Sequence, residues 1–283
     1  MILGRRSCRK ITIVGVGLIG GSLGLAIKKH RLAKEVAGLS YNQDSLEAAL
    51  NNQAIDVGFT DVGKAIRHAD MVILASPVDS IIRLLPAVNP YLKRGCVVTD
   101  VGSAKVEIVE AAQKKLSDPR FFVGAHPMAG SEKTGSDHAR ADMFEDSLCL
   151  ITPVAATHKN AVNKVKWLWT SLGAKVKRIS AEEHDEIMAY VSHLPHVAAY
   201  AMMNTIPEKY LSYAGQGLKD ATRIAASSAQ MWNDICMANA KNVVKGLDEM
   251  VKNLAELRQA IVHHDQKRLI KDFNAAREKR EKI

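Results

Sequence analysis

Cysteines are few in this sequence, and they lack the spacing that a metal site or a disulfide framework needs. The four thiols are Cys8, Cys96, Cys149 and Cys236, with no CxxC pair among them. A zinc site requires clustered ligands, and a disulfide-stabilised fold is typical of a much shorter secreted chain. We therefore expect no metal and no disulfide, and we interpret the cysteines as buried or incidental residues.

Long apolar segments are also missing. No apolar run approaches the roughly 18 to 20 residues that cross a bilayer, because Lys28, Lys29 and Arg31 end the longest early run. The basic segment 1–10 leads into a glycine-rich stretch that fits a strand and turn better than a signal-peptide core. We expect a cytoplasmic protein with no membrane partner.

Positive charge is in excess, with 39 Lys and Arg residues against 30 Asp and Glu and a net charge of +9. These basic residues are spread along the chain and accompany no recognisable nucleic-acid module, so we expect no nucleic-acid partner. A solvated basic surface of this kind attracts polyanionic small molecules over long range.

Two segments of different texture divide the 283 residues. Up to about residue 152, short β-rich apolar runs alternate with helical stretches, which predicts an α/β fold with a Rossmann-type, doubly wound parallel sheet. Beyond residue 180, long helical periodicity predicts an all-helical second domain. We place the dinucleotide-binding domain at 1–180 and the helical domain at 181–283. The predicted strands are 11–14, 36–39, 71–75, 96–99, 121–123 and 148–152, with an edge strand at 175–179; the predicted helices are 19–30, 44–52, 79–85, 104–116, 159–172, 181–205, 218–226, 229–257 and 259–281.

The first predicted strand leads directly into a GxGxxG turn that opens a helix. In a dinucleotide-binding turn the first glycine permits the tight bend, the second lets the backbone approach a pyrophosphate, and the third lets helix and strand pack closely. The helix N-terminus supplies unpaired N–H groups to the anion. We assign the turn to an NAD(P) cofactor, with a purely structural glycine turn as the alternative; the assigned residues are Gly15, Gly17, Leu18, Ile19 and Gly20.

The second predicted strand ends at Ser40 and Tyr41, where NAD-binding domains normally carry an acidic residue for the adenosine ribose. A serine removes the charge that would repel a 2'-phosphate, and it can donate a hydrogen bond to that group. We therefore favour NADP over NAD, although no Arg stands beside Ser40 and the use of both stays open. Ser76 and Pro77, directly after the strand at 71–75, are assigned to the cofactor as well.

Four further motifs follow the glycine turn. DVGSAK spans 100–105, HPMAGSEKTG 126–135, SHLPH 192–196 and GLKDATRIAAS 217–227. Together with GLIGGSLG at 17–24, and in their order and separation, they resemble the prephenate/arogenate dehydrogenases, also called cyclohexadienyl dehydrogenases. The resemblance extends from Lys10 to about Asp265.

This resemblance implies an oxidoreductase of tyrosine biosynthesis. It implies oxidative decarboxylation of prephenate to 4-hydroxyphenylpyruvate, of arogenate to tyrosine, or of both, with hydride transfer to NAD(P). His126 matches the family's catalytic histidine, whose neutral imidazole accepts the proton of the ring hydroxyl as hydride departs. Ser103 matches the serine that hydrogen-bonds the same hydroxyl and helps to orient the histidine.

The resemblance also assigns a substrate pocket. Arg223 corresponds to the family's substrate-binding arginine, and a guanidinium can grip a carboxylate in a bidentate way. His196, His193 and Ser192 match residues that line the pocket from the helical domain. Glu132 matches an acidic residue that pairs with a pocket histidine and controls access. An ordinary helix-surface or capping role is the alternative for each.

The family's helical domain binds substrate and forms the dimer interface, so a homodimer is expected, with helices 187–203 and 232–257 as candidates. Ser228-Ala229 stands where many relatives have Asp-Pro, which leaves the choice between pyruvyl and alanyl side chains open. We expect neither a carboxy-terminal regulatory domain nor a fused chorismate mutase, so tyrosine inhibition would act at the active site.

Two other functions are weighed against this one. A β-hydroxyacid dehydrogenase also joins a Rossmann domain to a helical one, but it uses a catalytic lysine where this chain has SHLPH. A non-catalytic NAD(P)-binding protein would lack His126 or Arg223, and both are present.

Overall fold

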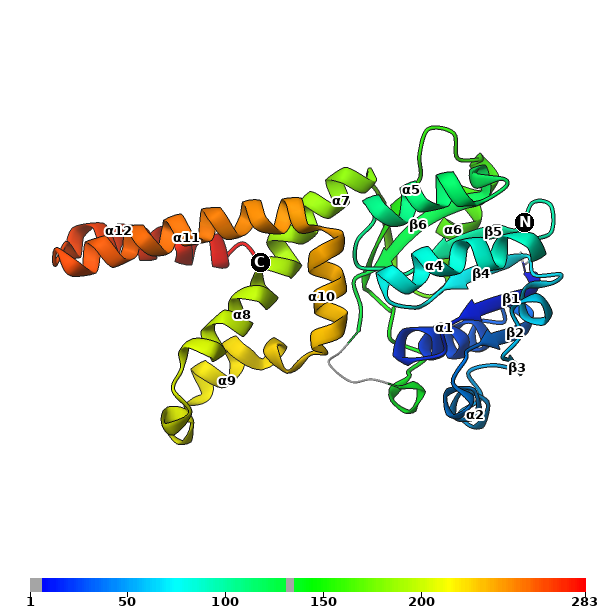
Figure 1. Ribbon diagram of the computed structural model, residues 1–283, viewed down its shortest axis with the longest axis horizontal. Coiled ribbons are helices and arrows are strands. Elements are labelled where there is room, and N and C mark those ends of the chain that lie inside the picture. Colours follow the sequence, from blue (N-terminus) through cyan, green and yellow to red (C-terminus); the bar gives the residue numbers. More distant parts are fainter. Residues whose placement is uncertain (1–6, 131–134) are drawn as a thin grey trace, which may run out of the picture. The chain divides into compact units, whose positions relative to one another are not determined.

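The computed structural model of the protein describes residues 7–130 and 135–283 (Figure 1). A first compact unit, residues 1–239, contains one eight-stranded sheet, and a second, residues 240–283, is helical. The strand order is β3-β2-β1-β4-β5-β6-β7-β8. The strands are β1 (Cys8–Val14), β2 (Ala33–Leu39), β3 (Val57–Phe59), β4 (Met71–Leu74), β5 (Val97–Asp100), β6 (Phe122–Pro127), β7 (Leu148–Thr152) and β8 (Lys175–Arg178).

The sheet is doubly wound about β1. This strand pairs in parallel with both β2 and β4, so the winding direction reverses between them. The pairs β2–β3, β4–β5 and β5–β6 are also parallel. Ligands of such sheets bind outside the carboxyl ends of the strands, where the strand order reverses. The predicted α/β Rossmann fold is confirmed, and its expected binding crevice lies beyond β1 and β4.

Two features of the sheet differ from the prediction. β7 runs antiparallel to β6, because the described residues between them form only a loop with a 3-10 turn and a parallel return needs a longer crossover. β8, reached through α6 (Lys159–Ser171), is parallel to β7 and forms the predicted edge. β3 was not predicted, since it has three residues with Gly58 at its centre and carries too little pattern.

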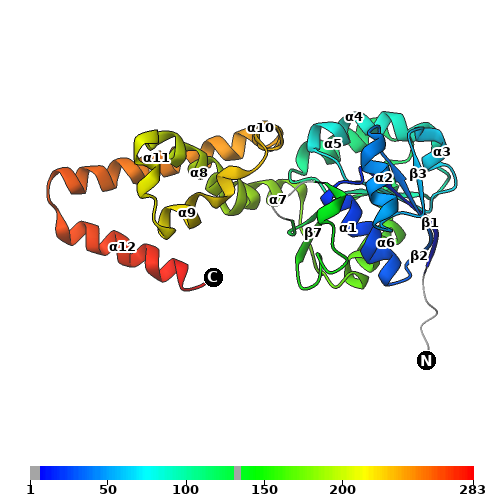
Figure 2. The ribbon, with the colours of Figure 1, turned by 90° about the horizontal axis from the view of Figure 1, so that it is seen from below.

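Helices cover both faces of the sheet (Figures 1 and 2). One face packs against α1, α2 and α6, where Leu23 and Trp169 are fully buried. The other packs against α3, α4 and α5, where Ile81 and Ile108 are fully buried. The bounds not yet given are α1 (Leu18–Lys29), α2 (Gln43–Asn51), α3 (Val62–Ile66), α4 (Val78–Val88) and α5 (Val106–Lys115), with the 3-10 turns η1 (Asn89–Tyr91), η2 (Pro119–Phe121) and η3 (Ser136–His138).

After β8 the first unit continues as helices. They are α7 (Ala181–Met188), α8 (Leu194–Thr205), α9 (Gln216–Thr222) and α10 (Ala229–Ala238), with the 3-10 turns η5 (Glu208–Tyr213) and η6 (Arg223–Ala226). The single helix predicted over 181–205 is interrupted by η4 (Ala189–His193), one π-helical turn between α7 and α8. A π turn adds one residue to the helix, so it shifts which side chains face a given direction beyond it.

The second unit is a pair of helices, α11 (Ala240–Val262) and α12 (Gln266–Arg280). Arg268 of α12 pairs with Glu256 of α11 at 3.0 Å. The helix predicted over 229–257 is two helices, α10 and α11, because Asn239 between them leaves the helical conformation at φ −124° and ψ 28°. In the described part of the chain, no helix is both long and apolar enough to pass through a membrane.

Candidate active site

The glycine turn between β1 and α1 has the backbone that a dinucleotide needs. Gly15 has φ +94°, and a Cβ there would lie 2.4 Å from the carbonyl oxygen of Ala75. A Cβ at Gly20 would lie 1.9 Å from the Gly15 oxygen, so α1 packs onto the turn only with glycine. At Gly17 no described atom lies within 4 Å of a Cβ, and no side chain caps α1 there. The turn therefore presents an open helix N-terminus, which fits a pyrophosphate.

A cavity of about 670 Å³ opens beyond this turn, at the carboxyl ends of the central strands. Its wall is formed by the glycine turn and the start of α1, by the segments that directly follow β4 and β5, by the end of β6, and by residues of η4, α8, η6 and α10. Ten of the predicted site residues line it, and they are Gly17, Leu18, Ile19, Ser76, Pro77, Ser103, His126, Ser192, His196 and Arg223. Segments far apart in the sequence thus converge on one volume large enough for a small molecule.

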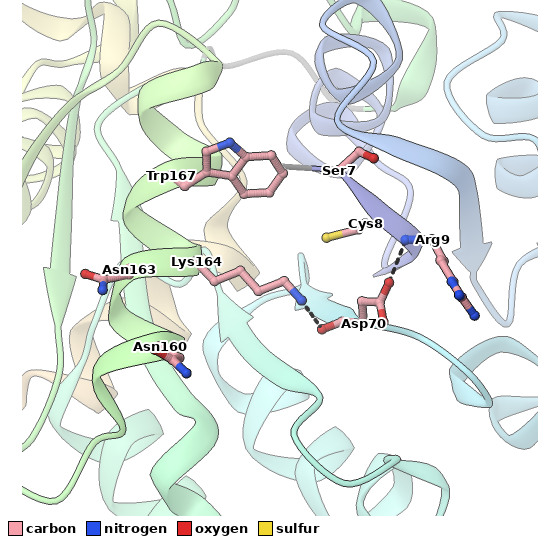
Figure 3. Close-up of a pocket in the computed structure, with 8 residues that line it drawn as sticks. All are labelled: Ser7, Cys8, Arg9, Asp70, Asn160, Asn163, Lys164 and Trp167. Atoms are coloured by element: carbon pink, nitrogen blue, oxygen red, sulfur yellow. Dashed lines mark hydrogen bonds between the residues drawn. The ribbon is translucent and has the colours of Figure 1, made fainter. Parts of the chain in front are cut away.

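A second cavity of about 590 Å³ lies near the amino ends of β1 and β4 (Figure 3). Its polar groups bind one another: the Asp70 carboxylate accepts the Arg9 N–H at 2.5 Å, and Lys164 Nζ donates to the Asp70 carbonyl at 2.9 Å. None of the predicted site residues lines it. We therefore assign the chemistry to the first cavity.

His126, near the end of β6, has one ring nitrogen held by a buried relay. Its Nδ1 lies 2.8 Å from His184 Nε2, and His184 Nδ1 lies 2.7 Å from the Asp185 carboxylate. Because the carboxylate only accepts, His184 carries its proton on Nδ1 and offers a lone pair on Nε2. His126 then carries its own proton on Nδ1. Its Nε2 keeps a lone pair, and it is the nitrogen left for a molecule in the cavity.

The Asp185 carboxylate also joins the relay to the sheet. It accepts the N–H groups of Lys105 at 2.7 Å and of Val106 at 2.9 Å. These are the first N–H groups of α5, so a side chain from α7 caps another helix. The positive end of the α5 dipole stabilises this buried anion, and the anion in turn orients His184.

Burial keeps the imidazoles of this relay neutral. Burial lowers the pKa of His126 well below 6.5, and electrostatic repulsion of its protonated form by His184 and Lys105 lowers it further. Burial also lowers the pKa of His184, although the hydrogen bond to Asp185 opposes the effect. His126 is therefore in the form that can accept a proton.

An ion pair between Asp100 and Lys105, both without exposed surface, fixes the strand segment before His126. The Asp100 carboxylate accepts the Ala125 N–H at 3.1 Å, and Lys105 Nζ donates to the Ala125 carbonyl at 3.0 Å. The carboxylate also accepts the Gly102 N–H at 2.8 Å, directly before Ser103. The pair thus holds both Ser103 and His126 in register at the cavity wall.

The cavity is also lined by His196, Trp232 and Arg223. His196 Nδ1 donates to the Ser192 carbonyl at 3.0 Å, one helical turn back. The His196 ring stacks on Trp232 with centroids 3.6 Å apart and planes 21° apart. Burial lowers the pKa of His196, the Ser192 hydrogen bond raises it and the Arg223 charge lowers it.

Several predicted residues lie elsewhere. His193 is fully buried and is not among the lining residues; its Nδ1 is 3.1 Å from Asn239 Nδ2, and burial lowers its pKa to about 4. Ser40 accepts the Asn42 N–H at 3.1 Å just beyond β2, and Tyr41 is 71% exposed beside it. Gly15 and Gly20 form the turn beneath the lining residues, and Glu132 falls outside the described residues.

Sequence reasoning missed the relay and its anchors. His184 and Asp185 stand in AEEHDEIM, which has the pattern of a polar helix surface, although both are buried. Asp100 and Lys105 begin and end the DVGSAK motif, but the motif alone indicates no role for either. An Asp that ends an apolar strand, followed by a Lys five residues later, is a signal that could have found this pair, because carboxylates and ammonium groups are buried almost only when they are paired.

A glycine turn at the reversal of a doubly wound sheet, next to a cavity with a neutral imidazole and a guanidinium, defines a nucleotide-dependent dehydrogenase of the Rossmann class. The profile described as "Prephenate dehydrogenase, nucleotide-binding domain" matches residues 23–178, and "Prephenate dehydrogenase, dimerization domain" matches residues 180–275. The chain belongs to the prephenate dehydrogenase family.

Individual relatives agree with these profiles. The chain is 33% identical to a prephenate dehydrogenase of Bacillus subtilis over 278 residues, covering 96% of this chain and 75% of the relative. It is 33% identical to a cyclohexadienyl dehydrogenase of Zymomonas mobilis over 282 residues, covering 96% and 95%. A crystal structure of A. aeolicus prephenate dehydrogenase with hydroxyphenyl propionate and NAD+ superposes with a TM-score of 0.91 at 33% identity, covering 98% and 99%.

Proposed function

We propose that the chain oxidatively decarboxylates prephenate to 4-hydroxyphenylpyruvate, with arogenate, which would give tyrosine, as the other candidate substrate. The observation that carries this proposal is the convergence of a tautomer-fixed His126 and of Arg223 on the cavity beyond the glycine turn. The relatives' names, prephenate and cyclohexadienyl dehydrogenase, support the same reaction class.

His126 is the proposed base. Bound NAD(P)+ supplies the hydride acceptor when it occupies the glycine turn. As hydride leaves the ring carbon that bears the hydroxyl, His126 Nε2 accepts the hydroxyl proton. The ring carboxylate departs as carbon dioxide, and its bonding electrons complete the aromatic ring. His126 then returns the proton to the phenolate oxygen, so the net reaction releases carbon dioxide and no proton.

Ser103 and the relay are proposed to position this base. Ser103 lies on the cavity wall with His126 and can hydrogen-bond the same hydroxyl. His184 and Asp185 touch no substrate in this scheme. They keep the proton of His126 on Nδ1, which leaves the correct nitrogen free and stabilises the imidazolium that forms.

Arg223 is proposed to bind a substrate carboxylate, and Ser192 and His196, which line the same cavity, to assist it. Among the described residues that line the cavity, none is acidic. An ammonium group on arogenate would therefore meet the Arg223 guanidinium and no carboxylate among these residues, which favours prephenate. We keep His193 as a positioning residue of this wall and Glu132 as its acidic neighbour in the family pattern.

For the cofactor, we propose that NADP is used at least as well as NAD. Ser40, just beyond β2, carries no charge that would repel a 2'-phosphate, and its hydroxyl can donate to that group. The solved relative binds NAD+, so both nucleotides belong in the assay. Gly15, Gly17 and Gly20 would hold the pyrophosphate whichever nucleotide binds.

A homodimer formed through the helical part is also proposed. The match to a dimerization domain supports it. Large apolar side chains of the second unit are exposed in the single chain, among them Val244, Val251, Leu254, Ile261, Val262, Ile270 and Phe273. Burying such a surface against a second copy is the usual way to remove it from water.

We propose the cytoplasm as the compartment, where the chain's free thiols stay reduced.

The deciding experiment follows absorbance at 340 nm with prephenate and arogenate, each against NAD+ and NADP+. His126→Asn should lower kcat by at least about a hundredfold, in the range for losing a general base, while nucleotide binding is retained. His68→Asn is the matched control, because His68 is exposed at φ +67°, which Asn tolerates. Near-normal turnover in the His126 variant would remove the assigned role.

A further inference from the structure

His196 presents one nitrogen whose proton depends on what occupies the cavity. Its Nδ1 is 3.0 Å from the Ser192 carbonyl, and a carbonyl only accepts, so Nδ1 carries a proton. In the neutral ring, Nε2 therefore holds a lone pair. Among residues 7–130 and 135–283 no hydrogen bond to Nε2 occurs, and the half-buried ring lines the cavity.

The surroundings of His196 balance its two protonation states. The stacked face of Trp232, 3.6 Å away, favours an imidazolium, as does the Ser192 hydrogen bond. The Arg223 guanidinium on η6 disfavours it, and so does burial. Among the described residues, His193 on η4 is a further titratable group whose charge interacts with that of His196. Without a ligand, burial and Arg223 prevail and the pKa of His196 is lowered.

The proposed substrates differ in what they offer to Nε2. This step rests on the proposed function. A pyruvyl side chain offers only acceptor oxygens, from its keto and carboxylate groups, and these repel a lone pair on Nε2. An alanyl side chain also offers an ammonium group, which can donate to that lone pair. The first ligand therefore requires a proton on Nε2, and the second does not.

We propose that His196 takes up a proton from solvent when the cavity binds a substrate or product whose side chain carries only acceptor oxygens, and stays neutral when that side chain carries an ammonium. Arg223 and the protonated His196 then hold the carboxylate from two sides. Ligands whose side chain carries only acceptor oxygens therefore bind more weakly as pH rises. The affinity of ligands that carry an ammonium group does not fall with pH in this way.

Two stable probes isolate this difference. 3-(4-Hydroxyphenyl)propionate and L-tyrosine share the phenol, the two-carbon chain and the carboxylate, and differ only in the ammonium group. Each is titrated into the full-length protein saturated with NAD+ by isothermal calorimetry, in buffers of different ionisation enthalpy at pH 7.5. The slope of observed enthalpy against buffer enthalpy gives protons bound per site. Any proton exchange at His126 is common to both probes and cancels in the difference.

The expected result is an uptake of close to one proton more for hydroxyphenylpropionate than for tyrosine. Its Kd should accordingly rise by up to about tenfold per pH unit where His196 is neutral in the free protein, as linkage requires, while that of tyrosine stays nearly flat. His196→Gln should abolish the difference, whereas His126→Asn should keep it. If His196→Gln does not fold, the pH dependence of the two Kd values in the unaltered protein decides the matter.

Equal proton uptake for the two probes, or a difference that persists in His196→Gln, overturns this inference and leaves the proposed reaction untouched. Failure of both probes to bind, together with no absorbance change at 340 nm with prephenate or arogenate, overturns the proposed function and the inference with it.

Discussion

Replacing His184 by Phe tests the relay behind the proposed base. Phe keeps a ring of similar size in a fully buried position. It removes the acceptor 2.8 Å from His126 Nδ1 and the donor 2.7 Å from Asp185. The His126 ring then loses the contact that selects its tautomer, so a fraction of the protein presents Nε2–H to the substrate and cannot accept its proton.

The size of the effect follows from the buried hydrogen bond. A buried donor left without its partner costs about 1 to 3 kcal/mol. If this cost falls on the transition state, kcat drops roughly 5- to 160-fold, at about 1.4 kcal/mol per factor of ten. The KM values for substrate and nucleotide should change little, because His184 does not line the cavity.

His184→Gln is the matched comparison. Its amide oxygen can accept from His126 Nδ1 and its amide nitrogen can donate to Asp185, so it should retain more activity than the Phe variant. Both variants are assayed at 340 nm after circular dichroism has shown a cooperative thermal transition. The smallest drop in kcat expected from the lost hydrogen bond is roughly fivefold. A folded Phe variant whose kcat stays within about twofold of the unaltered enzyme would therefore refute the relay.

Three further predictions concern other parts of the site. Arg223→Ala should raise KM for prephenate roughly 10- to 150-fold, the cost of one charge-assisted hydrogen bond, with Arg223→Lys in between; an unchanged KM would remove Arg223 from the site. The pKa of His126 is lowered and the base acts when neutral, so the acid limb of a kcat/KM profile should lie below pH 6.5; a limb above that pH would contradict the assigned base. Ser40→Asp should lower kcat/KM with NADP+ at least about tenfold through charge repulsion and leave NAD+ nearly unaffected; equal losses with both nucleotides would argue against a position near the 2'-phosphate.

Local spacing was sufficient to predict the glycine turn, because a Cβ at Gly20 would collide with Gly15, five residues earlier, and a Cβ at Gly15 would collide with Ala75, directly after β4. The winding of the sheet was equally accessible from alternating apolar runs. The site roles of the ten lining residues stay predictions, although the fold brings all ten to one cavity. Seven of them lie at or just after the carboxyl ends of β1, β4, β5 and β6, where ligands of such sheets bind. The other three, Ser192, His196 and Arg223, come from helical segments.

The His126–His184–Asp185 relay could not be predicted from the sequence, because it depends on contacts between residues far apart in the chain. Asp185 bonds to Lys105 across 80 positions of sequence, and nothing in a helix that begins AEEHDE indicates which polar side will be buried. His193 was expected on the pocket wall, yet the π turn that ends at this residue places it fully inside. A strict helical period cannot anticipate one extra residue.

Asp185 both caps α5 and orients His184, and these two contacts have different evolutionary consequences. Asp185 caps the N-terminus of α5 by accepting two backbone N–H groups. A chain selected only for stability would therefore still need a carboxylate at this position. The same selection gives less reason to keep the imidazole at 126, which lines the cavity. In a gene copy released from catalysis, drift should replace His126 first and this aspartate late, so the order of loss among descendants would record when turnover ceased to matter.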